Sequence, residues 1–303
     1  MSRPLKILLA TDGSDSALAV TDFLMGMPLP RGTQVTIVTV LKELLHEDEI
    51  AGLPADRRAA YAEMRSANNA EAQAMLDSEA ERLRASGLAV DTRILTGHAA
   101  EEIVRTATDE HYRIIAIGTH GTHDPQHFHL GSVSDRVFEY APCSVLIVRP
   151  ASTQADSDQE MRILLAYDDS PPARAAVELC ASLPLPRETR VKAVTAMPLI
   201  HMFRQDVRQQ LSWVWQEKKE KARMALDWVT AEIDWKDLEV TTELVESADV
   251  AQAILASAVA FDSDLVVIGH KGKRKFERFL LGSVTAHVTH HAPCSVLVVR
   301  ECA

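Results

Sequence analysis

The chain has few of the residues that mark specialised protein classes. Its 303 residues include four cysteines and no C-x-x-C pair, which argues against a disulfide scaffold, a zinc ribbon or a dithiol redox protein. No run of about 18 apolar residues exists, so no transmembrane helix is expected. The N-terminal apolar run is too short for a signal peptide. We therefore expect a cytoplasmic protein, with Cys143 and Cys294 as buried, reduced thiols at the start of apolar runs.

Basic residues are also in deficit. The formal net charge is −11, of which −7 falls in residues 1–150 and −4 in residues 151–303. Proteins that bind nucleic acids non-specifically neutralise phosphates with Lys and Arg. No nucleic-acid partner is therefore expected.

The sequence contains the same plan twice. LLATDGSDSALAV at 8–20 reappears as LLAYDDSPPARAA at 164–176, and APCSVLIVR at 141–149 reappears as APCSVLVVR at 292–300. These repeats are domain-sized, unlike the short units of a solenoid. We predict a first domain at 1–150, a polar linker at 151–160 and a second domain at 161–303.

Each half alternates short β-rich runs with longer helical patterns. In the first half, strands are predicted at 6–10, 34–40, 90–95, 113–118 and 144–148, and helices at 14–25, 57–86, 99–110 and 132–140. The second half has the same order. Strands that are apolar on both faces and separated by helices are typical of a parallel sheet covered on both sides. Each half is therefore predicted to be a doubly wound, Rossmann-like α/β domain with five strands.

Ligands of such domains bind beyond the carboxyl ends of the strands. The first strand is followed by Thr11-Asp12-Gly13-Ser14 in one half and by Tyr167-Asp168-Asp169-Ser170 in the other. Ser14 and Ser170 are good helix N-caps, so capping alone could explain both turns.

The turn after the fourth strand carries a stronger signal. Gly118-x-x-Gly121 is followed after nine residues by Gly131-Ser132, and Gly269-x-x-Gly272 is followed at the same spacing by Gly282-Ser283. Glycines let backbone N–H groups approach an anion closely, and the helix that begins there adds the positive end of its dipole. Glycines that only shape a turn are the alternative, but two copies with one spacing favour a phosphate site.

This pattern, G-x2-G-x9-G-[ST] with an aspartate after the first strand, resembles the universal stress protein family. More narrowly, it resembles tandem-domain members of the ATP-binding branch, over nearly the whole chain. The resemblance implies adenine-nucleotide alpha-hydrolase-like domains with strand order 3-2-1-4-5, which places the ends of strands 1 and 4 side by side. It also implies an adenine nucleotide ligand (ATP, ADP or AMP) with Mg²⁺, and a role in the stress response through ATP-dependent conformation or partner binding.

The resemblance implies the binding residues as well. Asp12 and Asp168 are expected at the adenine end, with the adjacent Thr11 and Tyr167 and backbone groups of Val40 and Ala196. The residues expected to hold ribose and phosphates in site 1 are Gly118, His120, Gly121, Gly131, Ser132 and Val133. Those expected in site 2 are Gly269, Lys271, Gly272, Gly282, Ser283 and Val284.

The two sites differ in charge. The site 2 stretch GHKGKRKFERFLLGS (269–283) has five Lys or Arg residues, expected to surround a polyphosphate, although outer ones such as Arg278 could instead answer acidic neighbours. The site 1 stretch HGTHDPQHFHL (120–130) has four His and no Lys or Arg, so its attraction for phosphate grows as pH falls through about 6.5. We expect site 2 to bind nucleotide more tightly at pH 8.

Two substitutions between the halves could oppose this difference. Asp169 replaces Gly13 and adds a carboxylate, which could weaken ATP binding or help to hold Mg²⁺. Tyr167 replaces Thr11 and could stack on the base or crowd it.

Histidines raise the question of a metal. Imidazoles at 120, 123, 127 and 129 could bind Zn²⁺ or Ni²⁺, but their spacing matches no established motif, and loop histidines without a ligand are the preferred interpretation. His287, His290 and His291 are predicted near the C-terminal end of a helix, where positive charge is favourable.

Signals for catalysis are weak. The P-loop G-x-x-x-x-G-K-[ST] is absent, as is the HxGH-type motif of adenylate-transferring relatives of this fold. Ser132 and Ser283 have no sequence signal for a partnered base. A nucleotide-binding sensor is the leading interpretation; a nucleotide-free interaction scaffold and a weak ATPase are the alternatives.

Assembly is also implied. Under the family's strand order, SVLIVRP and SVLVVR are edge strands, and apolar edges tend to be paired. The resemblance suggests that the two halves pair within the chain about a pseudo-two-fold axis and that a homodimer forms. The four tryptophans, Trp213, Trp215, Trp228 and Trp235, lie in or beside a predicted helical region at 203–234, and we expect them to cover a core.

Overall fold

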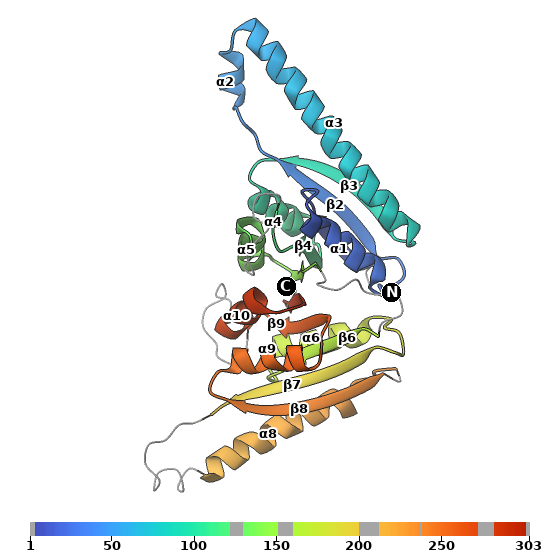
Figure 1. The fold of residues 1–303 in the computed structure, drawn as a ribbon, viewed down its shortest axis with the longest axis vertical. Coiled ribbons are helices and arrows are strands. Elements are labelled where there is room, and N and C mark those ends of the chain that lie inside the picture. Colours follow the sequence, from blue (N-terminus) through green and yellow to red (C-terminus); the bar gives the residue numbers. More distant parts are fainter. Residues whose placement is uncertain are drawn as a thin grey trace. The chain divides into compact units, whose positions relative to one another are not determined.

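The computed structural model describes residues 4–121, 130–150, 160–199, 212–236, 238–271 and 282–300. The chain divides into two compact units, Met1–Cys143 and Ser144–Ala303. Both are α/β units, as predicted (Figure 1). The predicted linker lies outside the described residues except for Glu160.

The first unit follows the predicted order of strands and helices, with one additional short helix, α2, that was not predicted. Its strands are β1 (Lys6–Ala10), β2 (Gln34–Leu41), β3 (Ala89–Thr96) and β4 (Ile114–Gly118). Its helices are α1 (Asp15–Gly26), α2 (Glu47–Ala51), α3 (Ala55–Ala85), α4 (Ala99–Asp109) and α5 (Ser132–Tyr140). The sheet order is β3-β2-β1-β4, and all of these pairs are parallel. This order matches the first four positions of 3-2-1-4-5.

The second unit repeats this plan. Its strands are β5 (Ser144–Val148), β6 (Arg162–Ala166), β7 (Arg190–Pro198), β8 (Glu239–Ser247), β9 (Leu265–Gly269) and β10 (Ser295–Val299). Its helices are α6 (Pro171–Ser182), α8 (Ser212–Ala231), α9 (Val250–Ala260) and α10 (Ser283–His291). The parallel order β8-β7-β6-β9-β10 is the predicted 3-2-1-4-5 arrangement.

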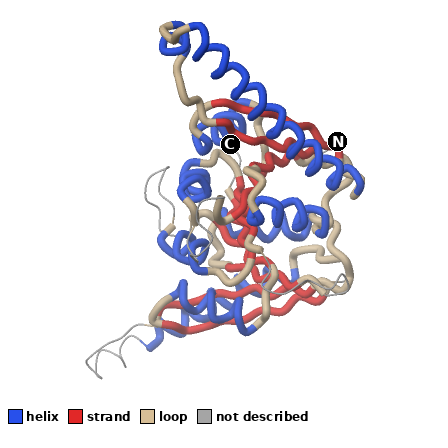
Figure 2. Tube along the Cα trace, turned by 45° about the horizontal axis from the view of Figure 1, so that its top comes forward, coloured by secondary structure: helices blue, strands red, loops and turns tan. Residues whose placement is uncertain are grey.

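Helices cover both faces of each sheet (Figure 2). In the first unit, α1 and α3 pack on one face, and α4 with α5 packs on the other. In the second unit, α6 and α8 form one layer, and α9 with α10 forms the other. The central strands β1, β4, β6 and β9 are almost wholly buried, which explains why their sequences are apolar on both faces.

One strand joins the two sequence repeats. β5, the last strand of the first repeat, pairs antiparallel with β10, the last strand of the second. Leu146 lies opposite Leu297 at the centre of this pair, and both side chains are 2% exposed. The backbone N–H of Arg149 donates to Ser295 Oγ (3.3 Å), and that of Arg300 donates to Ser144 Oγ (3.1 Å). The two predicted edge strands therefore pair with each other.

The helix α3 is longer than its sheet. Buried side chains occur only in its second half, at Ala72, Leu76, Glu79, Ala80 and Leu83. The first half continues past the sheet to α2, as Figure 1 shows. Residues 55–71 of this helix are exposed apart from Tyr61, which is half-buried. We call residues 55–71 the α3 arm.

The expected burial of the four tryptophans is only partly correct. Trp235 is buried (6% exposed), and its indole N–H donates to the Val229 carbonyl at 2.7 Å. Trp213, in contrast, is 65% exposed at the start of α8 and is not a core residue. Residues 200–211, in the region predicted to be helical from 203, lie outside the described residues.

The thiols agree with the expectation in part. Cys143, Cys180 and Cys294 are free, and Cys143 is buried as predicted, whereas Cys294 is only half-buried. Burial raises the pKa of the Cys294 thiol to about 12, which keeps it protonated. Within the described ranges, no helix has the length and apolar character to cross a membrane.

Candidate functional site

The turns after β1 and β4 meet at one edge of the first sheet. Ser16 Oγ accepts hydrogen bonds from the backbone N–H groups of Thr119 (2.9 Å) and His120 (3.2 Å). Ser14, which caps α1, also donates its hydroxyl to the His120 carbonyl at 3.4 Å. Helix α1 therefore fixes the turn after β4, so that the two predicted halves of site 1 lie together.

Glycine is required where these turns touch. A Cβ on Gly121 would lie 2.6 Å from Asp12 Oδ2, and one on Gly118 would lie 2.6 Å from the Ser16 carbonyl oxygen. Contacts of this length do not occur for a real Cβ, so a larger residue at 118 would displace the backbone at the start of α1, and one at 121 would displace the Asp12 carboxylate. The motif glycines thus set the separation between the Asp12 turn and the turn after β4.

Backbone groups of β2 face the same place. The Val38 carbonyl accepts the Thr11 N–H at 2.9 Å. Successive residues of a strand direct their backbone groups to opposite neighbours, so Val40 faces the same side as Val38. The pairing of β1 with β2 ends at Val38, which leaves Val40 beyond it, beside the Asp12 turn. Ala196 has the same relation to Val194, whose carbonyl accepts the Tyr167 N–H at 2.9 Å.

The glycine loop of each site is closed at its base. In site 1, the Gly131 N–H (2.7 Å) and the Ser134 hydroxyl (3.0 Å) both donate to the Thr119 carbonyl. In site 2, the Gly282 N–H donates to the His270 carbonyl at 3.1 Å. Thr285 Oγ1 donates to the Gly269 carbonyl at 2.8 Å. The start of α5 or α10 is therefore held against the preceding turn.

The helix starts direct backbone N–H groups at the site. Gly131 and Gly282 are the N-caps of α5 and α10. The first N–H groups of a helix have no partner within it, which suits them to an anion. Ser132 and Ser283 are exposed there, and the following Val133 and Val284 are half-buried.

Site 2 is built by the same elements with different contacts. Asp168 Oδ1 accepts the Ser170 N–H (3.1 Å), and Ser170 Oγ donates to the Lys271 carbonyl (3.3 Å). Pro172 stands where site 1 has Ser16, and a Cβ on Gly269 would lie 2.8 Å from its carbonyl carbon. The turns after β6 and β9 therefore converge in site 2 as well. Gly272 and the basic residues 273–278 lie outside the described residues.

The universal stress protein family model matches this chain twice, at residues 5–149 and 161–300. The chain belongs to the universal stress protein family. The two matches correspond to its two sequence repeats, so this is a tandem universal stress protein.

Individual relatives agree. The universal stress protein YxiE of Bacillus subtilis is 27% identical over 145 residues, which are 48% of this chain and 98% of that protein. A universal stress protein of Mycolicibacterium smegmatis is 29% identical over 218 residues, 71% of this chain and 70% of that protein.

Solved structures share the fold. A universal stress protein from Archaeoglobus fulgidus superimposes with a TM-score of 0.62 at 20% identity, over 98% of this chain and 96% of that one. A protein of unknown function from Pseudomonas aeruginosa superimposes with a TM-score of 0.61 at 15% identity, over 98% and 92% of the two chains.

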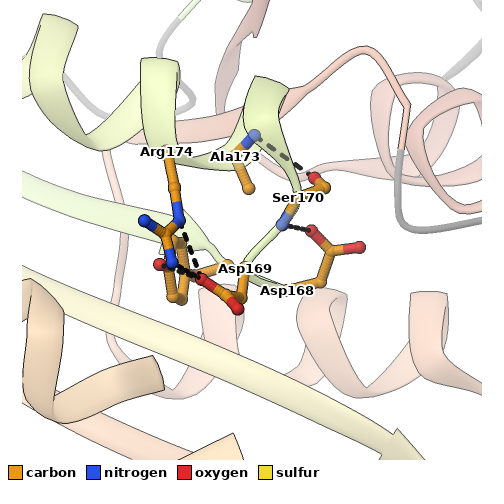
Figure 3. A network of polar contacts seen from close by, with 6 residues as sticks. Asp168, Asp169, Ser170, Ala173 and Arg174 are labelled. Carbon is orange, nitrogen blue, oxygen red and sulfur yellow. Dashed lines mark hydrogen bonds and ion pairs between the residues drawn. The ribbon is translucent and has the colours of Figure 1, made fainter. Parts of the chain in front are cut away.

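The residues that differ between the two sites of this universal stress protein form a network in the second unit (Figure 3). Asp169 Oδ1 accepts from Arg174 Nη2 (2.6 Å) and Nε (2.9 Å), and from the Tyr167 hydroxyl (3.0 Å). The Arg174 guanidinium lies 4.9 Å from the Trp228 ring centroid, and the Tyr167 and Trp228 rings are stacked at 6.0 Å. Burial raises the pKa of the Tyr167 hydroxyl.

This network bears on the alternatives left open for Tyr167 and Asp169. Tyr167 is 2% exposed and its ring packs on Trp228 of α8, which disfavours stacking on a base. The Asp169 carboxylate is paired with Arg174, which neutralises the charge expected to oppose ATP. Asp169 has φ 61°, close to the 74° of Gly13, so the left-handed turn is the same in both units.

Glu79, which the sequence analysis did not identify, contacts the turn of site 1. The Glu79 carboxylate of α3 is 1% exposed and accepts hydrogen bonds from the hydroxyls of Thr11 (2.6 Å) and Thr21 (2.8 Å). Burial raises the pKa of Glu79, and the two hydroxyl donors oppose this effect. Glu79 lies three residues after Leu76 and four before Leu83, so the helical spacing places it on the buried face of α3, whereas its acidic neighbours Asp77 and Glu81 are exposed.

A histidine lies in the turn after β4, and another lies in the turn after β9. His120 has a buried Nε2 with no hydrogen-bond partner among the described residues. His270, at the position of Thr119, has a pKa lowered to about 4 by burial and by the nearby Arg300 and Lys271, so it is neutral at physiological pH.

Of the four histidines in the site 1 stretch, His120 lies in the part of the chain that the structure describes. In the part of the chain that the structure describes, no group of three or more His, Cys, Asp or Glu side chains is placed to hold a metal ion. His123, His127 and His129 lie outside that part. His290 and His291 lie in the last turn of α10 as predicted, and His291 stacks on His287 at 4.2 Å.

Proposed function

We propose that the protein binds an adenine nucleotide in each repeat and that nucleotide occupancy changes its conformation or its choice of protein partner. The observation that carries this proposal is the close approach of the end of β4 to the start of α1, where a Cβ on Gly118 would lie 2.6 Å from the Ser16 carbonyl oxygen and one on Gly121 would lie 2.6 Å from Asp12 Oδ2. A backbone held this tightly exposes N–H groups to an anion without side chains in the way.

The hydrogen-bonding groups around site 1 suit an adenine nucleotide. Asp12 and the backbone of Val40 offer acceptors and a donor for an adenine edge, and the first N–H groups of α5 suit phosphates. His120 Nε2 is a buried polar atom that a ligand could satisfy. Site 2 repeats these features with Asp168, Ala196 and α10, and adds Lys271.

Further parts of the proposal rest on the family resemblance. ATP with Mg²⁺ is the proposed resident ligand, the proposed domains are 1–150 and 161–303, and a cytoplasmic homodimer is the proposed form. Site 2 is the proposed tighter site at pH 8. Its extra carboxylate, Asp169, does not oppose this because Arg174 pairs with it.

The test begins with the freshly purified chain. The protein is denatured, and released adenine nucleotide is quantified per chain by mass spectrometry, before and after incubation with Mg-ATP. We expect one or two equivalents, and one fewer in Asp12→Ala or Asp168→Ala according to the site removed. Loss of nucleotide from Asp12→Ala alone would assign the resident ligand to site 1.

The absence of binding at millimolar Mg-ATP in calorimetry would overturn the proposal. In that case both glycine loops serve the fold, and the scaffold interpretation stands. Measurement of phosphate release by the same samples tests the weak ATPase alternative separately.

A further inference from the structure

The strongest unexplained feature outside the predicted sites is the buried Glu79. Its carboxylate is 1% exposed in the layer between α3, α1 and the first sheet. The bonds from Thr11 and Thr21, at 2.6 and 2.8 Å, use one carboxylate oxygen each. Taking a carboxylate out of water is costly even when hydroxyls donate to it. A residue with this cost calls for a reason other than packing.

The chain itself shows that the fold does not need this carboxylate. In the second unit, Tyr167 stands at the position of Thr11 and Val177 at the position of Thr21. Helix α8 supplies buried Leu226 and Val229 to the same layer. The same strand, turn and helix arrangement is thus built there with apolar and aromatic side chains. Glu79 is specific to site 1.

The network ends at the turn that carries Asp12. Thr11 Oγ1 donates to Glu79 and accepts the backbone N–H of Gly13 at 3.2 Å. Gly13 has φ 74°, so the turn needs an unusual backbone conformation at this residue. Asp12 lies between the two bonded residues. Thr21, in contrast, ties Glu79 to the middle of α1.

We propose that Glu79 is a positioning residue of site 1: through the Thr11 hydroxyl it fixes the Thr11–Gly13 turn and so presents Asp12 to the nucleotide. This inference rests on the proposed function. A turn that is ordered before binding does not have to lose conformational entropy when the ligand arrives. Site 2 reaches the same turn geometry through the Asp169–Arg174 pair and the buried Tyr167.

The test uses the full-length chain carrying Asp168→Ala, so that Mg-ATP titration by calorimetry reports site 1. Glu79→Gln keeps the shape of the side chain but removes its charge, and Thr11→Val removes the link to the turn. Thr21→Val is the matched control, because it removes the other hydroxyl bonded to Glu79. We expect affinity about tenfold weaker in the first two variants, the effect of losing one charge-assisted hydrogen bond, and within about twofold in the control.

A second readout does not depend on the ligand. Hydrogen exchange of the Gly13 amide is expected to accelerate in Glu79→Gln and Thr11→Val and to stay unchanged in Thr21→Val. Equal effects of Thr11→Val and Thr21→Val on both readouts would show a merely structural role and overturn the inference. If the Asp168→Ala parent binds no Mg-ATP, the proposed function fails at site 1, and the exchange rates alone decide whether Glu79 orders the turn.

Discussion

At the scale of single residues, Glu79 makes the stability of the protein depend on pH. Burial raises its pKa above the ordinary value near 4.5, and the approach of Asp12 adds to this, whereas Thr11, Thr21 and Arg82 oppose it. A raised pKa in the folded state means that folding favours the protonated carboxyl. Ionisation of Glu79 therefore lowers the free energy of unfolding as pH rises through the folded-state pKa.

Glu79→Gln tests this effect because glutamine stays neutral. We expect the variant to gain free energy of unfolding relative to the natural protein as pH rises from about 4 to 8, with the gain confined to the window above the ordinary carboxyl pKa. Urea denaturation at each pH unit measures the difference. The control is Glu81→Gln, an exposed position on the same helix, for which a flat difference is expected. A difference for Glu79→Gln that does not change with pH would contradict the prediction.

The same residue marks what sequence could and could not predict about the site. The strand order implied by the family resemblance predicted which turns would meet, and a Cβ added at Gly118, Gly121 or Gly269 would approach another residue closer than 3.0 Å. Glu79 is 68 residues from Thr11 and 58 from Thr21 in sequence, and its role depends on their convergence in space. The pairing of Asp169 with Arg174 was missed for a related reason: whether a carboxylate faces a ligand depends on its rotamer and its partners.

At the scale of elements, the predicted strands and helices agree with the described residues to within a few positions, and only the short helix α2 was not predicted. The α3 helix was predicted at 57–86 and spans Ala55–Ala85. What sequence did not reveal is how much of it packs. Apolar or small residues at four- and three-residue spacing, Ala72, Leu76, Ala80 and Leu83, meet the sheet, and the α3 arm before them does not.

The α3 arm is expected to open far more easily than the rest of its helix. A helical segment that buries little side-chain area is only marginally stable in water. We expect amides of residues 58–70 to exchange at least about a hundredfold faster than those of residues 74–83, which open only with the sheet. Hydrogen exchange followed by mass spectrometry measures this on peptides from the two halves. Equal protection along the helix would show that the arm is covered by something, such as a second copy of the chain.

At the scale of the whole molecule, the strand pair β5–β10 couples the two repeats. Leu146 belongs to the first sequence repeat, yet it lies opposite Leu297 and inside the second compact unit. All four tryptophans, at 213, 215, 228 and 235, belong to that unit, so their fluorescence reports on its unfolding.

Leu146→Ala is therefore expected to destabilise the tryptophan-reported transition by about 2–5 kcal/mol, the usual cost of a large-to-small change in a core. The matched control is Leu8→Ala in β1, an equally buried leucine of the first unit. It should lower the stability seen by circular dichroism with a smaller shift in the fluorescence midpoint. If Leu146→Ala leaves the fluorescence transition unchanged, β5 does not contribute to the second unit in solution.

The β5–β10 pair also bears on how the chain is made. When the first repeat leaves the ribosome, β5 exists without its antiparallel neighbour, because β10 (Ser295–Val299) follows much later in the chain. At the usual rates of protein synthesis, translating the ~150 residues between β5 and β10 takes roughly 8–30 s. A small domain folds in far less time. For that interval the nascent chain presents the apolar edge SVLIV, a segment that other unfinished chains could join. During this interval, a chaperone at the ribosome exit tunnel would have the unpaired strand β5 to cover.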